Sequence, residues 1–330
     1  MSENTARPVV PAAEEILGLY FPVLDHGFVS LVDYMGGDEC VARAARVCYG
    51  AGNKKSGQTR GLVRYLHRHK HTSPLEMVEV KLHCSMPIFV ARQWIRHRTA
   101  NVNEMSGRYS LMPMLFYTPP DDQLRPQSKT NKQGRDGEAF TTEIIAEANA
   151  RWAAQRTDAV DNYEWLCDRD FARELARIDL PLSTYTQWYW KIDLHNLLHF
   201  LTLRVDSHAQ WEIQQFGKVM AGMLKRLAPL AYEAWIDYEV CGARLSRMEL
   251  EILRLGCQTQ PDDGHLRTYP GAISPEAAAG YGLTEREVDE FFSLFKPEKL
   301  VVPDFELDLA VARTAEYFEA EAAAAVPAVK

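Results

Sequence analysis

Residues 76–86, EMVEVKLHCSM, set apolar side chains in alternation with charged or polar ones. The apolar side chains recur at every second position, at Val78, Val80, Leu82 and Cys84. This is the period of a β-strand with one apolar face. The residues that follow, PIFVARQWIRHR, have the pattern of a helix with Pro87 near its first turn. We therefore expect a strand and a helix joined without a linker, with Gln93 and Arg96 to Arg98 carried into an irregular loop where the helix ends.

The segment from Arg92 to Ser110, RQWIRHRTANVNEMSGRYS, holds four arginines and one histidine, and Glu104 is its only acid. Arginine is suited to bidentate recognition of phosphates and carboxylates. Apolar residues such as Trp94 and Met105 stand between these cations, so we expect the segment to be half-buried. A buried arginine needs a partner, and one glutamate cannot serve four of them. The segment therefore indicates an anionic ligand.

Charge is unevenly distributed along the chain. The formal net charge is −8, yet residues 1–250 contain 30 acids and 30 bases, and residues 251–330 contain 15 acids and 7 bases. Residues 51–100 carry ten Lys or Arg side chains against Glu76 and Glu79. Nucleic acid and a small phosphorylated metabolite are both candidate partners for this basic block.

Length and composition indicate a soluble globular protein with one large domain or two ordinary ones, since the chain has 330 residues, 46% hydrophobic and 25% charged. Its longest apolar runs, such as MPIFVA, are far too short to cross a bilayer. The N-terminal residues lack the pattern of a secretory signal. The six cysteines are scattered, with no CxxC pair. We therefore expect reduced thiols and a cytoplasmic location.

The rest of the chain predicts both strands and helices. Further strands are expected at 28–34 and 180–192. Helices are expected after an N-cap at Asp38, over 59–70, within 139–177 and over 193–230, the last with a break near Asp206 and Ser207. Residues 117–138 are polar and contain Pro and Gly, which predicts a surface loop. In the acidic tail, Thr284 and Glu287 form a capping box.

Some side chains could suggest other chemistry. One group resembles a metal-binding tract: His67, His69 and His71. Their spacing of two suits no helix face, so a solvated basic helix end is the better interpretation for the first two. His195 and His199 share a helix face but lack the glutamate of an HExxH motif. Ser106 lacks the Gly-x-Ser-x-Gly elbow of a serine nucleophile. We predict no metal site.

The stretch RHRTANVNEMSGRYS resembles the signature of the flavin-dependent thymidylate synthases, RHRxxSxNExSxRY. The matching residues are Arg96, His97, Arg98, Asn103, Glu104, Ser106, Arg108 and Tyr109. Asn101 stands where the usual pattern has serine. Both side chains are small and form hydrogen bonds, so we expect altered local bonding rather than lost activity. Further blocks resemble the family in the family's order: GFVSLVDYMGGD, ARAARVCY, HTSPLEM, PIFVARQWIRHR, ARIDLPLSTYTQWYW and HFLTLRVDSHAQWEIQ.

The resemblance covers roughly residues 25–250 and implies an α+β fold, in which helices flank an antiparallel sheet. We accordingly divide the sequence into three parts. Residues 1–24 are an N-terminal extension, residues 25–255 the catalytic domain, and residues 256–330 an acidic C-terminal appendage whose role is unknown.

The resemblance implies synthesis of dTMP from dUMP. The one-carbon unit comes from methylenetetrahydrofolate, and NADPH supplies the reducing hydride by way of bound FAD. Members of the family are homotetramers whose sites lie where subunits meet. The expected partners are therefore dUMP, folate and NADPH, with no nucleic acid and no membrane.

The resemblance also assigns site residues by position, through side-chain or main-chain groups. Those expected at dUMP are Gln93, Trp94, Ile95, Arg96, Glu104, Met105, Ser106, Gly107, Arg108, Arg177 and Arg204. Those expected at FAD or the folate are His71, Ser73, Arg96, His97, Arg98, Glu104, Asp193, Leu194, His195 and His199. Ser106 and Arg108 would hold the phosphate of dUMP, and Arg96 to Arg98 would meet the pyrophosphate of FAD.

Arg204 is the expected catalytic residue. The corresponding arginine of the family faces the uracil ring near nitrogen 3. A fixed cation there stabilises negative charge on the ring as the proton leaves, which makes carbon 5 nucleophilic. Because the pKa of arginine lies above about 12, it is a poor general base, and we assign Arg204 an electrostatic role.

Two alternatives stay open at this point. One is a nucleic-acid-binding protein that uses the basic segment 51–108, and the other is a flavin- and nucleotide-binding homologue without activity. The sequence does not order the methylene and hydride transfers. It also gives no preference between NADPH and NADH, because no separate GxGxxG fingerprint is present.

Overall fold

The computed structural model describes residues 7–47, 59–129, 133–259, 266–268, 273–296 and 301–326. The chain forms two compact units. The first comprises Met1–Glu233 together with Phe305–Lys330, and the second comprises Ala234–Asp304. This structural division differs from the sequence division at residue 255, because the last part of the chain returns to the first unit. The appendage expected over 256–330 is thus shared between the two units.

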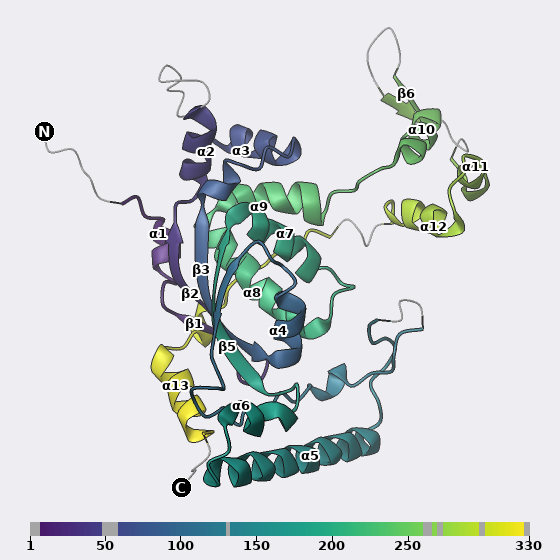
Figure 1. The fold of residues 1–330 in the computed structure, drawn as a ribbon. Coiled ribbons are helices and arrows are strands. Elements are labelled where there is room, and N and C mark those ends of the chain that lie inside the picture. The colour runs from purple at the N-terminus through teal and green to yellow at the C-terminus, as the bar shows by residue number, and fades with distance from the viewer. Residues whose placement is uncertain are drawn as a thin grey trace, which may run out of the picture. The chain divides into compact units, whose positions relative to one another are not determined.

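A five-stranded antiparallel sheet runs through the first unit (Figure 1). Its strands are β1 (Tyr20–Val23), β2 (Gly27–Met35), β3 (Glu79–Pro87), β4 (Asn101–Glu104) and β5 (Tyr185–Asp193). They lie in the order β1-β2-β3-β5-β4, and every neighbouring pair is antiparallel. The predicted strands correspond to β2, β3 and β5, and the predicted α+β class with an antiparallel sheet is confirmed.

Three helices cover one face of the sheet: α4 (Ile88–Trp94), α7 (Leu194–Arg204) and α8 (Trp211–Leu227). Trp94 is fully buried there, and its ring centroid lies 5.4 and 5.2 Å from those of Trp188 and Trp190. Phe200 of α7 and Phe216 of α8 complete the aromatic cluster. Since residues two apart in a strand face the same side, this cluster fixes α4 against the sheet. The arginine-rich segment begins where α4 ends.

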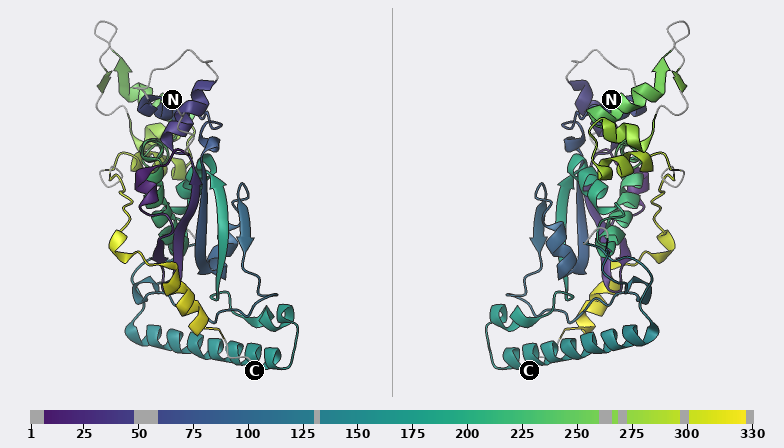
Figure 2. Two further views of the ribbon diagram at one scale, coloured as in Figure 1. Left: turned by 90° about the vertical axis from the view of Figure 1, so that its left-hand side faces the viewer. Right: turned by 90° about the vertical axis from the view of Figure 1, so that its right-hand side faces the viewer.

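The other helices of the chain up to residue 235, and of its C-terminal part, lie beside the sheet or in its connections. They are α1 (Pro11–Glu14), α2 (Asp38–Val47), α3 (Thr59–Arg68), η1 (Leu75–Met77), η2 (Asp121–Gln123), α5 (Thr142–Asp168), α6 (Arg173–Ala176), η3 (Arg177–Asp179), α9 (Pro229–Trp235), η6 (Leu309–Val311) and α13 (Ala315–Ala324). The yellow helix α13 lies on the sheet face opposite α7 and α8 (Figures 1 and 2). The predicted break near residue 206 is confirmed, because α7 ends at Arg204 and α8 begins at Trp211.

One capping prediction was wrong. Asp38 begins α2, but its carboxylate accepts hydrogen bonds from the main-chain nitrogens of Leu230 and Ala231, at 2.7 and 3.0 Å. It therefore caps the start of α9, a helix far away in the sequence. Burial raises the pKa of the Asp38 carboxyl group.

The second unit is small and mainly helical. It contains η4 (Ile236–Val240), α10 (Arg247–Gly256), β6 (Cys257–Thr259), β7 (Leu266–Thr268), α11 (Pro275–Gly280) and α12 (Glu285–Ser293). Its core joins Ile252, Val288 and Phe291. The capping box is confirmed, since Thr284 and Glu287 each accept a hydrogen bond from the main-chain nitrogen of the other, at 3.3 and 2.8 Å. No helix of the described residues has the length and apolar character needed to span a membrane.

Candidate active site

The arginines that follow α4 lie at the surface. The helix ends at Trp94, and Ile95, Arg96 and Arg98 are all exposed. Among the residues that the structure describes, neither guanidinium has an ion-pair or hydrogen-bond partner. A phosphate or pyrophosphate would supply the missing negative charge, because the guanidinium fork matches its oxygens. The arginines of the segment, Arg92, Arg96, Arg98 and Arg108, are all exposed, so the expected half-burial is wrong for its cations, which are open to an anionic ligand.

His97 lies between these two arginines and is tied to α7. Its Nε2 accepts a hydrogen bond from Nε of Arg204 at 3.0 Å. The ring packs edge-on against Phe200, with centroids 4.8 Å apart, and lies 6.1 Å from the ring of the exposed His199. Burial, helped by the charge of Arg204 and by His199, lowers the pKa of His97 from 6.5 to about 4. His97 is therefore neutral at pH 7, and the bond assigns its proton to Nδ1.

Arg204, the predicted catalytic residue, is held at one nitrogen of its guanidinium group. His97 occupies Nε, whereas Nη1 and Nη2 have no partner within the described parts of the chain. Burial lowers the pKa of Arg204, but an arginine stays charged at pH 7. Gly217 allows α8 to approach closely, since a Cβ there would lie 3.3 Å from the carbonyl carbon of Arg204. The arrangement presents two free donors on a fixed cation.

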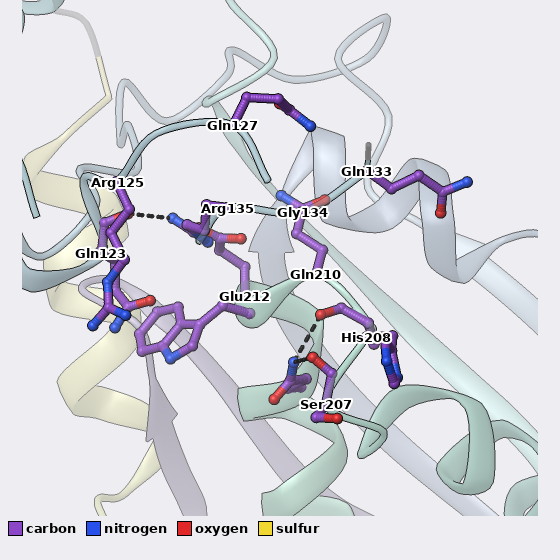
Figure 3. A pocket seen from close by; sticks show the side chains of 13 residues that line it. Gln123, Arg125, Gln127, Gln133, Gly134, Arg135, Ser207, His208, Gln210 and Glu212 are labelled. Carbon is purple, nitrogen blue, oxygen red and sulfur yellow. Dashed lines mark hydrogen bonds and ion pairs between the residues drawn. The ribbon is translucent and has the colours of Figure 1, made fainter. Parts of the chain in front are cut away.

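A polar pocket adjoins Gln93, one of the residues predicted at dUMP. Gln93 Nε2 donates to Gln210 Oε1, and Gln210 lines a pocket between the loop after Pro120 and the turn before α8 (Figure 3). Arg135 lines this pocket and forms a 2.6 Å ion pair with the buried Glu212. From the sequence we predicted only a surface loop here, because the partners of the loop lie far away along the chain. No local pattern marks Arg135 or Glu212.

The second half of the signature segment begins at the far end of β4. Glu104 accepts a hydrogen bond from Thr186 Oγ1 at 2.7 Å. The main-chain nitrogen of Met105 donates to the oxygen of Gln187 at 2.9 Å, which extends the pairing with β5 by one residue. The chain then turns at Ser106, which is half-buried. Pairing with β5 therefore sets the position from which this loop starts.

Close packing brings Arg177 to the same loop. A Cβ on Gly107 would lie 2.6 Å from Sδ of Met112 and 3.2 Å from Cδ of Arg177. Only glycine fits between them without a shift. The structure thus places Arg177 beside Gly107, the chain neighbour of Ser106, and all three are residues expected at dUMP. Arg177 is half-buried and has no ion-pair partner among the described residues.

Arg108, the expected phosphate ligand, has an acidic neighbour. Its Nε donates to Glu174 Oε2 at 3.0 Å, and both side chains are more than half exposed. An exposed ion pair of this kind contributes only about 0–1 kcal/mol. A phosphate with two negative charges can therefore displace Glu174 at little cost.

Several of the residues expected at the flavin or folate lie around the first turn of α7. The short helix η1 packs against α7, and the main-chain nitrogen of Leu194 donates to the oxygen of Val78 at 2.8 Å. These contacts bring the HTSPLE segment towards the start of α7. His71 and Ser73 are exposed there, and His195 is half-buried.

His67, one turn before this segment, is not solvated as the sequence suggested. It is buried in α3. Burial, with contributions from Lys70 and His195, lowers its pKa from 6.5 to about 4. The apolar face of α3 includes Val63 and Leu66, and their helical spacing with His67 was the signal for its burial.

Three of the predicted site residues use their side chains inside the protein. Trp94 and Leu194 are fully buried in the core, so only their main-chain groups can meet a ligand. The carboxylate of Asp193 caps α7, accepting from N and Nδ2 of Asn196 at 2.9 and 2.6 Å. The side chains of these three residues therefore stabilise the fold around the site and do not line it.

Asn101, which replaces the serine of the family signature, begins β4. It is exposed, and its side chain has no hydrogen-bond partner in the described part of the chain. The fold around it therefore does not depend on which of the two residues is present.

Apart from the residues around α7, the predicted residues form two groups that precede and follow β4 in the chain. The helix-end group comprises residues 93–98 with Arg204, and the loop group comprises residues 104–108 with Arg177. Between them lies β4, whose last residue, Glu104, belongs to the loop group; its four residues span roughly 13 Å at about 3.3 Å per residue. Within the described residues no side-chain hydrogen bond or ion pair joins the groups, and no cluster of three or more His, Cys, Asp or Glu is arranged to hold a metal ion.

Comparison with known proteins identifies the family. The profile of the family described as thymidylate synthase complementing protein matches residues 30–230. The flavin-dependent thymidylate synthase of Wolbachia pipientis wMel is 50% identical over 254 residues, which cover 77% of this chain and 89% of the relative. That of Dictyostelium discoideum is 49% identical over 242 residues, covering 71% and 79%.

A solved structure has the same fold. The crystal structure of the UMP/dUMP methylase PolB from Streptomyces cacaoi, bound with 5-Br dUMP, has a TM-score of 0.60 and 32% sequence identity. It covers 66% of this chain, and 97% of PolB is matched. The profile match spans β4, α7 and the whole signature segment. The chain therefore belongs to the flavin-dependent thymidylate synthases, a family of methyltransferases.

Proposed function

We propose that this protein makes dTMP from dUMP, with methylenetetrahydrofolate as the one-carbon donor and NADPH as the reductant through bound FAD. The observation that carries the proposal is the bond between His97 of the family signature and Arg204 of α7. It fixes a cation with two open donors beside a surface that carries two further arginines without acidic partners. Such a surface suits a nucleotide substrate and a dinucleotide cofactor together.

The loop group binds the phosphate of dUMP in this proposal. Ser106 and Arg108 hold its oxygens, and Arg177 adds a second cation from the side of η3. Arg108 exchanges the carboxylate of Glu174 for the phosphate. Charge-assisted hydrogen bonds of guanidinium to phosphate are about twice as strong as neutral ones, so this loop anchors the nucleotide.

The helix-end group fits a flavin dinucleotide. Arg96 and Arg98 are exposed and without acidic partners, which suits the two charges of a pyrophosphate. His71, Ser73, His195 and His199 contribute polar groups near the start and along the face of α7. When bound, the flavin supplies hydride-transfer chemistry that no side chain of this protein can provide.

Arg204 stabilises charge on the uracil ring. Its open Nη donors face the negative charge that develops as the ring loses its proton, and this raises the nucleophilicity of carbon 5. His97 positions Arg204 by accepting from Nε. Because the cation is fixed before the reaction, no reorganisation is needed when the charge appears.

The separation of the two groups supports sites that are shared between subunits. In one chain Arg204 bonds to His97, which precedes β4, whereas the loop group follows β4, and no side-chain hydrogen bond or ion pair among the described residues joins them. A homotetramer that brings the helix-end group of one subunit to the loop group of another would complete each site. This is the assembly that the family resemblance implies.

The test is tritium release from dUMP labelled at carbon 5, with methylenetetrahydrofolate present and with FAD and NADPH each omitted in turn. The proposal predicts release that requires FAD and NADPH, with dTMP as product. A folded, yellow protein that binds dUMP but releases no tritium would show a homologue without activity, and the proposal would be withdrawn.

A further inference from the structure

The C-terminal segment 305–326 lies outside the residues that match the family profile, yet it is part of the first unit. It starts beside α8 and α9. The main-chain nitrogen of Phe305 donates to Tyr232 Oη at 3.3 Å, and Glu306 pairs with Lys225. Leu307 packs so closely on α8 that a Cβ on Gly222 would lie 2.8 Å from its Cγ. The segment is thus anchored on the helical side of the unit.

From there the segment crosses the edge of the sheet at β1. Tyr20 and Arg313 exchange two main-chain hydrogen bonds, N to O at 2.9 Å and at 2.8 Å in the other direction. This antiparallel bridge covers the outer strand, whose edge would otherwise offer unpaired donors and acceptors.

Helix α13 then packs on the second face of the sheet. Phe318 is only 7% exposed, and its ring centroid lies 4.8 Å from that of Phe28 and 5.9 Å from that of Tyr20. One turn further along, Glu321 Oε1 forms a 2.6 Å pair with His26 Nδ1. An apolar contact and a hydrogen bond therefore hold the same face of α13.

The segment ends on the chain that continues from the signature. The main-chain nitrogen of Met114 donates to the oxygen of Ala325 at 2.9 Å. Two residues earlier, the side chain of Met112 is the one that packs on Gly107, and its main-chain nitrogen donates to Tyr163 Oη at 3.2 Å. A continuous series of contacts thus leads from Ala325 through Met114 and Met112 to Gly107.

We propose that residues 305–326 form a strap that positions the loop of residues 105–115, and through it Ser106 and Arg108. In this proposal the strap makes no contact with dUMP. It acts by holding Met114, which limits the positions open to Met112 and Gly107. The assignment of Ser106 and Arg108 to the phosphate of dUMP rests on the proposed function, whereas the mechanical link between strap and loop does not.

The first measurement is hydrogen–deuterium exchange of full-length Phe318→Ala against the unchanged protein. Loss of this buried ring should loosen α13 from the sheet, so amides of residues 105–115 should exchange about tenfold faster, while those of β3 and β5 keep their rates. Phe318→Leu should restore most of the protection. Tyr317→Ala removes an exposed ring of the same helix and serves as the matched control.

The second measurement separates positioning from a merely structural role. In Phe318→Ala the KM for dUMP should rise about fivefold to tenfold, with kcat and the KM for NADPH within about twofold. If Phe318→Ala does not fold, Glu321→Gln should show the same pattern with a smaller change. Faster exchange of α13 with no change in residues 105–115 would overturn the proposal, and so would equal acceleration throughout the sheet.

The two proposals can fail separately. If the unchanged protein releases no tritium from dUMP but Phe318→Ala still exposes residues 105–115, the proposed function falls and the strap stands. If the unchanged protein turns over normally but Phe318→Ala leaves the exchange of residues 105–115 unchanged, the strap proposal falls and the proposed function stands.

Discussion

The two halves of the signature segment are held in different ways. Residues 96–98 follow a helix that is fixed in the aromatic core, and His97 bonds directly to Arg204. Residues 106–108 lie on a loop that depends on the packing of Gly107 against Met112 and Arg177. The first half is set by the core of the sheet, and the second by contacts at its margin.

This difference predicts which substitutions should lower turnover and which should weaken dUMP binding. A cation locked by a neutral histidine is suited to stabilising charge in a transition state. A loop with an exchangeable surface ion pair is suited to capturing a phosphate. We therefore expect changes in the helix-end group to lower kcat, and changes in the loop group to weaken dUMP binding.

The largest effect should come from Arg204→Lys. A lysine keeps the charge but lacks the several donor nitrogens of the guanidinium group. It therefore cannot bond to His97 and the uracil ring together. We expect kcat to fall by about 10²–10³-fold, with the Kd for dUMP changed only a few-fold. Steady-state kinetics and calorimetric titration would measure both, with Arg92→Lys as an exposed control. Equal losses in binding and turnover would contradict the electrostatic role.

Arg108→Ala should have the opposite signature. Loss of one charge-assisted contact to phosphate corresponds to about 1.5–3 kcal/mol, or roughly 10- to 100-fold in the Kd for dUMP. The affinity for FAD should stay the same, because the cations assigned to FAD lie at the other end of β4. Flavin fluorescence and dUMP titrations on one preparation test this. Weakened FAD binding would mean that the two groups are not distinct.

Replacement of His97 tests whether the helix-end group acts on turnover through Arg204. His97→Ala should lower kcat about tenfold by leaving Arg204 without its acceptor, and His97→Gln should recover part of it through its amide oxygen. The pKa of about 4 keeps His97 neutral at higher pH, so this group should add no acidic limb to the kcat profile above roughly pH 5. Such a limb, absent in His97→Gln, would contradict the assignment.

The smallest effect concerns stability and His67. Its pKa is about 4 in the fold against 6.5 in the unfolded chain, so between these values the unfolded state binds more protons. The stabilisation is fully present above pH 6.5 and is lost as the pH falls towards 4. Thermal melts across this range should show a shallower slope for His67→Gln. An unchanged slope would place this histidine in solvent.

Local sequence patterns predicted the strands and helices whose apolar residues recur at a regular spacing. The alternation of Val78, Val80 and Leu82 predicted β3, and the turn near residue 206 marked the break between α7 and α8. The carboxylate of Asp38 was assigned to the wrong helix, because the choice between two nearby helix starts depends on tertiary contacts. His67 was misplaced for a related reason, since its charged neighbours outweighed its position on the apolar face of α3.

The candidate site was predicted by motif rather than by spacing. The resemblance named His97 and Arg204 separately, but their hydrogen bond joins residues that lie far apart in the sequence and no local pattern shows it. The pair of Arg135 and Glu212 was missed for the same reason. The strap could not be predicted because Phe318 and Glu321 stand in an alanine-rich acidic tail, and only the fold reveals Phe28 and His26 as their partners.

The most direct test of a site shared between subunits is complementation. Arg204→Lys and Arg108→Ala would be mixed, dissociated and reassembled, and tritium release measured at a dUMP concentration well below the weakened Kd of Arg108→Ala, where each variant alone has little activity. If each site takes its helix-end group from one subunit and its loop group from another, random assembly restores about a quarter of the original activity. If each chain builds its own site, no mixed site has both halves intact. Activity that stays at the level of the separate variants would then contradict the account.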